Sequence, residues 1–346
     1  NGFFMNDSLK NKAWEEILSL NPFIRYFLRQ LESTVTILMY HGVVNDSEKV
    51  HAWTLVKASE FEQQIKFLKR HFEIISLDDL LSNSKTLGRD KRPKAIITFD
   101  DGLRNNLSVA LPLLEKYNIP ATVYISTAAV QNKALFWWDR IIEAIFKTKI
   151  DKLDLTAYAL GTYNFNHGAS PKLFWGDIQK LLDDLKSLEM EARMEVADGI
   201  AASGIREKNL EDSPFKPLTP NEVSALSGSD LIAIGSHSHC HNILTRIPLL
   251  QAEDSIRTSV ELLKEWTDQE INHFSFPNGN YNQELLKIVE GAGLKTAVTT
   301  MRGRWRKGSS LYEIKRIGVG GYDGLPYFKS SLSGGADCLK KLVGRR

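Results

Sequence analysis

Two adjacent carboxylates, Asp100 and Asp101, directly follow an apolar run at residues 95–99 and precede Gly102. The ends of parallel strands are where α/β folds gather their active-site groups. Neighbouring residues at a strand end point in different directions, so one carboxylate can bind a cation while the other accepts a proton. An Asp-Gly turn that only ends the strand would explain the same residues. The two aspartates alone therefore do not distinguish a functional site from a turn, and further candidate residues from elsewhere in the chain are needed.

Three of the eight histidines lie within residues 237–241, again after an apolar run. His237 and His241 are four residues apart, so on one helical turn or compact loop they can share a metal ion. Cys240 is a rival ligand, but a closed structural site needs a fourth ligand, and Cys338 is the only other thiol. Two histidines and one carboxylate would leave positions open for water and substrate, as catalysis requires.

Two weaker signals have the same strand-end character. The expected strand at residues 273–276 runs into Pro277-Asn278-Gly279, a loop that can present backbone N–H groups to a ligand. His41 follows a β-branched run at residues 35–40. Taken singly, the first is an ordinary turn and the second a structural histidine.

In combination, these segments resemble the polysaccharide deacetylase family, the NodB-type group also called carbohydrate esterase family 4. Its first three motifs are similar to residues 98–102, 237–241 and 276–279, in that order. The resemblance covers roughly residues 35–130 and 230–320. It implies a metal-dependent hydrolase that removes the N-acetyl or a related acyl group from an amino sugar in a glycan or glycan precursor.

The resemblance also assigns roles residue by residue. It implies that Asp100 is the general base for a metal-activated water, and that Asp101, His237 and His241 bind a divalent metal. Zn²⁺ is the expected ion, with Co²⁺, Ni²⁺, Mn²⁺ or Fe²⁺ as alternatives for the same ligands. The segment around His41 resembles the branch with circularly permuted motif order, in which a histidine after the first strand is the catalytic acid.

The chain departs from the family at two places. The arginine that opens the third motif is missing, and Phe274 and Ser275 stand near its position. Arg316 is our candidate for orienting Asp100 in its stead. The tryptophan-bearing fourth motif has no clear match, although Trp305 lies in the corresponding region. The expected substrate-binding residues are Tyr40, Pro277, Asn278, Gly279, Tyr281, Trp138 and Arg316.

Seven apolar runs are expected to form the strands that position these residues. Their apolar character is continuous rather than alternating, which is typical of strands covered on both faces. With the helical patterns between them, they predict right-handed βαβ units, and the resemblance implies an α/β fold of the distorted (β/α)7-barrel type. The expected strands are 35–40, 95–99, 122–126, 231–235, 273–276, 296–299 and 314–319.

The helical segments define the expected domain organisation. A capping box at Ser59 and Glu62 predicts the start of one helix, and 106–117, 249–266 and 283–290 are further helices. Residues 131–220 hold helical patterns without a core strand, so we expect a mainly helical insertion. The barrel would then occupy 34–346, behind an N-terminal helical extension at 1–33.

The composition limits the kinds of molecule that we expect the protein to bind. With 44 basic and 42 acidic residues, the net charge is +2, which provides no strong field for nucleic acid. No apolar run reaches the roughly 20 residues of a membrane span. No signal peptide is visible, so we expect a cytoplasmic protein with a carbohydrate substrate. The sequence leaves the oligomeric state open.

Other classes of function remain at this point. A non-catalytic carbohydrate-binding protein on the same fold would have little need for the complete set of four site residues. A glycoside hydrolase barrel would use paired carboxylates from different strands and would leave the histidine cluster unexplained. A zinc-stabilised binding module would unfold when its metal is removed.

Overall fold

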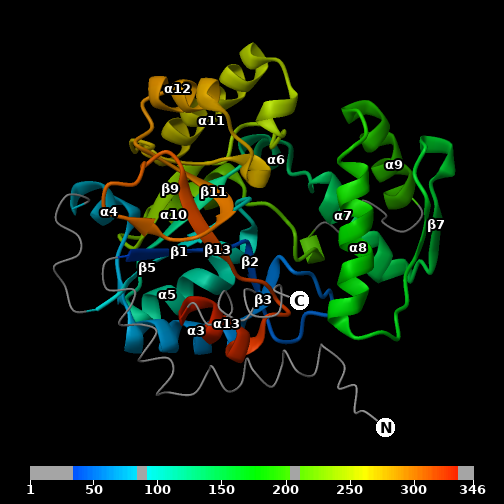
Figure 1. The fold of residues 1–346 in the computed structure, drawn as a ribbon, viewed down its shortest axis with the longest axis horizontal. Helices are drawn as coiled ribbons and strands as arrows, with labels where there is room; N and C mark the ends of the chain where they lie inside the picture. Colours follow the sequence, from blue (N-terminus) through cyan, green and yellow to red (C-terminus); the bar gives the residue numbers. More distant parts are fainter. Residues whose placement is uncertain (1–33, 84–91, 203–210, 334–346) are drawn as a thin grey trace, which may run out of the picture.

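The computed structural model describes residues 34–83, 92–202 and 211–333. Within these ranges, seven parallel strands close into a barrel with helices around it (Figure 1). Their order around the barrel is their order in the chain, and the last strand pairs with the first. The strands are β1 (Thr34–Tyr40), β5 (Lys94–Phe99), β6 (Ala121–Ile125), β9 (Ile232–Ser236), β10 (His273–Ser275), β11 (Thr296–Arg302) and β13 (Ile314–Gly318). The expected distorted (β/α)7 barrel is confirmed.

The strands are apolar on both faces because each face meets a different part of the core. On β5, Ile96 packs inside the barrel with Val35 and Ile37 of β1, whereas Ile97 and Phe99 pack outward against helices. Both β1 and β5 are buried along their whole length. This two-sided burial explains the continuous apolar runs.

Helices cover the outside of the barrel and fill the connections between strands. They are α3 (Ala58–His71), α4 (Leu77–Asn83), η1 (Asn106–Ala110), α5 (Leu111–Tyr117), α6 (Thr127–Asn132), α10 (Pro220–Ser227), α11 (Leu249–Thr267), α12 (Gln283–Gly291) and α13 (Gly324–Ser333). The helices expected at 106–117, 249–266 and 283–290 are present, although the first begins as a π-helical turn. Among the described residues, no helix has the length and apolar composition of a membrane span.

The expected capping box at Ser59 is wrong. Helix α3 begins at Ala58 directly after β3 (Leu55–Lys57), so Ser59 already lies in its first turn and its backbone N–H donates to Asp46. A complete capping box is present instead at the start of α10, where Thr219 and Glu222 cap each other's backbone N–H groups. The same residue pattern therefore has a different meaning where a strand runs straight into the helix.

The insertion forms a separate lobe beside the barrel, at the right in Figure 1. It contains α7 (Trp137–Thr148), α8 (Pro171–Leu185), α9 (Met190–Ala202) and a hairpin of β7 (Lys152–Asp154) and β8 (Thr162–Asn164). The hairpin adds two short strands to an insertion that we expected to be mainly helical, and strands of three residues are too short to show a periodic pattern in the sequence. Helix α8 ends at Leu185, and α9 begins at Met190 after a short connection.

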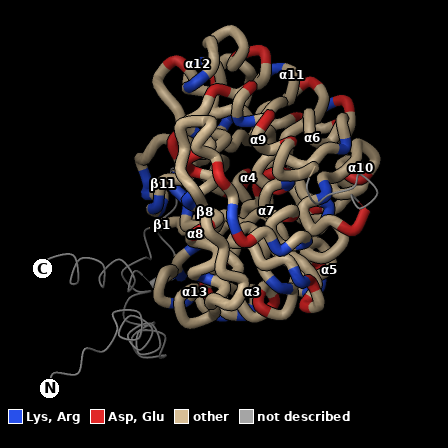
Figure 2. The backbone as a smooth tube through the Cα atoms, turned by 90° about the vertical axis from the view of Figure 1, so that its right-hand side faces the viewer, with Lys and Arg blue, Asp and Glu red and all other residues tan. Residues whose placement is uncertain are grey.

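The lobe has its own apolar cluster, which extends into the barrel. Ile141, Ile178 and Leu181 belong to the same buried cluster as Leu55 and Leu103 from barrel loops. Basic and acidic residues alternate along the backbone on this side of the molecule, without a large region of one sign (Figure 2). The charge distribution therefore agrees with the near-neutral composition.

Four short elements complete the described residues around the barrel. Strands β2 (Gly42–Val44) and β3 form a separate parallel pair. Strand β4 (Glu73–Ile74) extends the sheet beside β5, and β12 (Trp305–Arg306) pairs antiparallel with the start of β1. Since β12 meets β1 at Thr34 and Val35, Trp305 lies at the amino end of the strands, away from the residues that follow them. Trp305 is therefore not a candidate for the site.

Gly235 provides a test of the packing between β9 and its neighbours. A Cβ atom at this position would lie 2.5 Å from the ring of Tyr124 and 3.0 Å from the carbonyl oxygen of His273. We expect Gly235→Ala to lower the free energy of unfolding by about 1–3 kcal/mol, because the barrel must shift to admit the methyl group. Gly176 in α8 has open space at the same point, so Gly176→Ala should stabilise by about 0.5–1 kcal/mol. Urea denaturation measures both, and equal midpoints would contradict this interpretation.

Candidate active site

The site lies at the carboxyl ends of the barrel strands. Asp100 and Asp101 follow β5, His237 and the loop to His241 follow β9, and Asn278 follows β10. Asp101, His241 and Asn278 all have positive φ, at 76°, 53° and 56°. Non-glycine residues rarely adopt this region, and its cost of about 1–3 kcal/mol persists mainly where the surroundings hold a functional geometry.

Asp101, His237 and His241 bring three potential metal ligands to one point. Their Nε2 and carboxylate atoms all lie within 4.8 Å of one another. The two imidazole Nε2 atoms are 3.1 Å apart, and Oδ1 of Asp101 lies 3.5 Å from His237 and 3.3 Å from His241. Tetrahedral coordination with bonds of 2.0–2.2 Å separates neighbouring ligand atoms by about 3.4 Å. The three side chains therefore fit a divalent ion without rearrangement.

Their protonation states also suit a metal. Nδ1 of His237 donates to the carbonyl oxygen of Ser275 at 2.7 Å, which leaves the Nε2 lone pair directed at the site. Burial alone would raise the pKa of Asp101, but its hydrogen bonds with His237 and His241 hold it well below the ordinary value. Asp101 is thus an anion facing two imidazoles.

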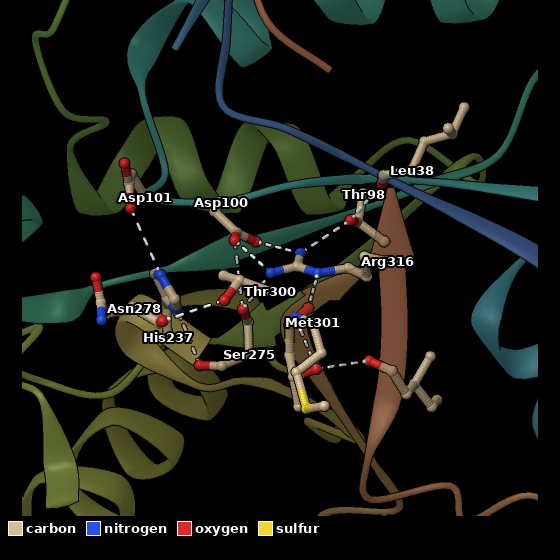
Figure 3. A network of polar contacts seen from close by, with 12 residues as sticks. Leu38, Thr98, Asp100, Asp101, His237, Ser275, Asn278, Thr300, Met301 and Arg316 are labelled. Carbon is tan, nitrogen blue, oxygen red and sulfur yellow. Dashed lines mark hydrogen bonds and ion pairs between the residues drawn. The ribbon is translucent and has the colours of Figure 1, made fainter. Parts of the chain in front are cut away.

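Asp100 is paired with Arg316, as Figure 3 shows. The guanidinium donates to both carboxylate oxygens, at 2.7 and 2.6 Å, and also donates to Thr98 and Ser275. Burial acts to raise the pKa of Asp100, but the charge of Arg316 lowers it below the ordinary value. Arg316 therefore takes the orienting position for which the third motif lacks its arginine, as we expected. Because its side chain is only 1% exposed, Arg316 is not a substrate contact.

His41 lies on the same cavity as Asp100 and Asp101. Its ring packs edge-on against Trp53, with 5.7 Å between centroids. Its backbone oxygen accepts a hydrogen bond from Asn106, and its buried Nδ1 has no partner within the described part of the chain. The imidazole of His41, directly after the first strand, therefore lines the same cavity as the two aspartates.

A cavity of about 620 Å³ opens above these groups. The insertion forms much of its wall, through Phe136, Trp138, Trp175 and Met190 among others. Trp138 packs against the ring of His241 at 4.7 Å, and Phe136 stacks on Trp138. The cavity therefore lies between barrel and insertion, with aromatic rings beside a candidate metal ligand.

Several residues that we expected to contact the substrate do not line the cavity. The prediction that Tyr40 binds substrate is wrong, because its side chain points outward from the barrel, packs on Phe61 and donates to Gln64. Pro277 and Gly279 are the buried residues of the short turn that follows β10. Of the Pro-Asn-Gly motif, only Asn278 lines the cavity.

Tyr281 is also outside the set of residues that line the cavity, and its hydroxyl donates to Glu313. Trp138 does line it, as expected. Trp53 and Trp175 also line the cavity and were not among the expected contacts. Their residue type was the only available signal, since nothing local distinguishes a cavity-lining tryptophan from one in the core.

Comparison with known proteins decides the family. A family model described as polysaccharide deacetylase matches residues 88–297. The chain belongs to the polysaccharide deacetylase family. That range contains the two aspartates and both histidines of the candidate site, and the family relatives are hydrolases of carbon–nitrogen bonds.

Two curated relatives show how far this similarity extends. YxkH of Bacillus subtilis is 21% identical over 287 residues, which cover 82% of this chain and 70% of YxkH. The poly-β-1,6-N-acetyl-D-glucosamine N-deacetylase of Staphylococcus aureus strain MSSA476 is 27% identical over 179 residues. That match covers 47% of this chain and 60% of the staphylococcal enzyme.

Solved structures support the fold. IcaB from Ammonifex degensii matches with a TM-score of 0.55 and 14% identity, over 87% of this chain and 97% of IcaB. The polysaccharide deacetylase BC0361 from Bacillus cereus matches with a TM-score of 0.53 and 17% identity, over 86% and 69% of the two chains. At these identities, the likeness concerns the fold alone.

Proposed function

We propose that this protein is a divalent-metal-dependent deacetylase that removes the acetyl group from an N-acetylated amino sugar in a glycan. The observation that carries the proposal is the convergence of three free ligand atoms, from Asp101, His237 and His241, beside a buried and ionised Asp100. The N-deacetylase activity in the name of the staphylococcal relative supports the choice of reaction.

A divalent ion, with Zn²⁺ as the expected one, would polarise the acyl carbonyl and lower the pKa of a nearby water molecule. Asp100 accepts the proton of the attacking water. Its carboxylate has four lone-pair sites, of which the Arg316 guanidinium uses two, so it keeps capacity for a further hydrogen bond. The low pKa of Asp100 keeps it ionised, and the rigid ion pair fixes its direction.

His41 delivers the proton that the departing amine needs. It follows β1, the strand that pairs with β5, lines the same cavity as Asp100, and has no partner for its Nδ1 within the described residues. Asn278 borders the cavity at a backbone conformation with positive φ, and its loop would supply an N–H group to the developing oxyanion. Trp138 and Phe136 provide flat apolar surfaces on which a sugar ring packs.

Acetate release from N-acetylglucosamine oligomers tests the proposal. We expect release with Zn²⁺ present, loss of activity after chelation and recovery when Zn²⁺, Co²⁺, Ni²⁺, Mn²⁺ or Fe²⁺ is returned. Circular dichroism of the chelated protein should show a folded chain, because the barrel core does not depend on the three ligands.

Two results would contradict the proposal. Unfolding on chelation, without any acetate release before it, would identify a metal-stabilised binding module. Absence of release from every N-acylated glycan tested, with the metal bound and the protein folded, would favour a non-catalytic carbohydrate-binding protein.

A further inference from the structure

The end of the cavity contributed by the insertion carries positive charge that the proposed reaction does not use. Lys186, which follows α8, and Arg193, in α9, both line the cavity that contains Asp100 and the three candidate metal ligands. The rest of this end is apolar, with Leu182, Met190 and Met194 in its wall. Cations in such surroundings need an anionic partner.

Arg193 is held over an aromatic ring rather than in an ion pair. Its Cζ lies 5.3 Å from the centroid of the Trp137 ring, and its buried Nε has no hydrogen-bond partner in the part of the chain that the structure describes. No described carboxylate lies within ion-pair distance of it. By contrast, Arg104, Arg140 and Arg257 each pair with a carboxylate.

A second guanidinium stands beside the first. Arg246 donates from Nη1 to the backbone oxygen of Lys186 at 2.5 Å, which joins the loop after His241 to the end of α8. Burial, followed by the charge of Arg246, lowers the pKa of Arg193. Lys186 has one carboxylate contact, to Asp183 at 3.0 Å on the more exposed side. Glu189, whose charge acts to raise the pKa of Arg193, lies one turn before it, and Arg246 is exposed and outside the cavity lining. The positive charge of Arg193 and Lys186 at this end of the cavity is therefore only partly compensated.

A continuous set of ring contacts connects this cluster to the candidate metal site. The ring of His241 is 4.7 Å from Trp138, Trp138 is 5.6 Å from Trp137, and Arg193 lies over Trp137. A substrate whose acyl group reaches Asp100 would therefore extend along these aromatic faces towards Arg193.

We propose that Arg193 and Lys186 bind a phosphate group carried by the substrate, so that the protein deacetylates a glycosyl phosphate or diphosphate. A guanidinium and an ammonium group at the same end of the cavity suit a phosphate or diphosphate, which offers several acceptor oxygens to such donors. This inference rests on the proposed deacetylase function and specifies its substrate class.

Paired substrates test it. Acetate release is compared for a neutral N-acetylglucosamine oligomer, for uridine diphosphate N-acetylglucosamine and for polyprenyl-diphosphate-linked N-acetylglucosamine. The two phosphorylated compounds distinguish a nucleotide from a lipid as the source of the phosphate. We expect Arg193→Gln to raise KM roughly 10- to 100-fold for the preferred phosphorylated substrate, because it removes charge-assisted hydrogen bonds. The KM for the neutral oligomer should change by less than about twofold in the same variant.

Matched variants keep this comparison interpretable. Arg257→Gln removes one arginine of an exposed i,i+4 pair on α11 and should leave every substrate unaffected. Lys186→Gln should reproduce the effect of Arg193→Gln in weaker form, and it serves as a second probe if Arg193→Gln fails to fold. Equal effects of either cavity variant on neutral and phosphorylated substrates would overturn the proposal, as would a preference of the wild-type protein for the neutral oligomer.

A binding measurement separates this proposal from the proposed function. Isothermal titration of inorganic pyrophosphate into the metal-free protein should detect binding that Arg193→Gln weakens and Arg257→Gln does not. If wild-type protein deacetylates none of the substrates but binds pyrophosphate in this way, the deacetylase function fails while the anion site stands. If it releases acetate but pyrophosphate does not bind, the phosphate site fails and the deacetylase function stands.

Discussion

Asp100→Asn is expected to lower the rate of acetate release by roughly 10²- to 10⁴-fold, because the amide cannot accept the proton of the attacking water. Metal content should stay near that of the wild-type protein, since Asp101, His237 and His241 are unchanged. Single-turnover acetate release and metal analysis of the purified variant measure the two effects separately.

Asp101→Asn is the matched control for this experiment. It changes the neighbouring carboxylate, which faces the two histidines at 3.3 and 3.5 Å, so it should reduce metal affinity and activity together. Normal acetate release by Asp100→Asn would exclude Asp100 as the base. Loss of metal from Asp100→Asn would instead place Asp100 among the ligands.

Arg316→Met is expected to lower the free energy of unfolding by about 3–5 kcal/mol, because it leaves the carboxylate of Asp100 buried without its cation. Asp100 is 2% exposed and Arg316 is 1% exposed, so water does not replace the lost partner. Urea denaturation at neutral pH measures the loss. A double variant, Asp100→Asn with Arg316→Met, should recover part of it, since no buried charge remains.

The single variant Arg316→Met should also change the pH dependence of activity. In the wild-type protein the pKa of Asp100 lies below its ordinary value, so the base stays ionised down to acidic pH, and the stabilisation from the ion pair is lost as pH falls through that low pKa. Without Arg316, burial dominates and the pKa rises. The acidic limb of kcat/KM should therefore move to higher pH, and an unchanged limb would show that Arg316 does not control Asp100.

Much of the barrel was predictable because its strands are local features. Each of the seven expected strands overlaps an observed strand, since a strand buried on both faces needs a continuous apolar run. The candidate ligand set came from the resemblance to the family, and spacing along the chain by itself indicated only that the two histidines could share a metal ion. Asp101 directly follows the Asp100 carboxylate, and His237 and His241 lie within one short loop, so the spacing along the chain already restricts their geometry.

Other features depend on how the chain closes in three dimensions. Asp100 and Arg316 are 216 residues apart, and they meet only because β13 returns beside β1. Tyr40 is adjacent to His41, yet it faces the outer helices. The side of the barrel that each residue of a strand faces is set by closure, which local composition does not encode.

The sequence by itself therefore determined the strands, the paired aspartates and the histidine pair, because each depends on neighbours along the chain. Only the tertiary structure decided that Arg316 holds Asp100, that tryptophans of the insertion border the site, and that Arg193 faces the same cavity. These contacts join segments separated by whole strands and helices. The contact between Arg316 and Asp100 depends on closure of the barrel, and the other two depend on packing of the insertion against its open end. Spacing along the chain encodes neither.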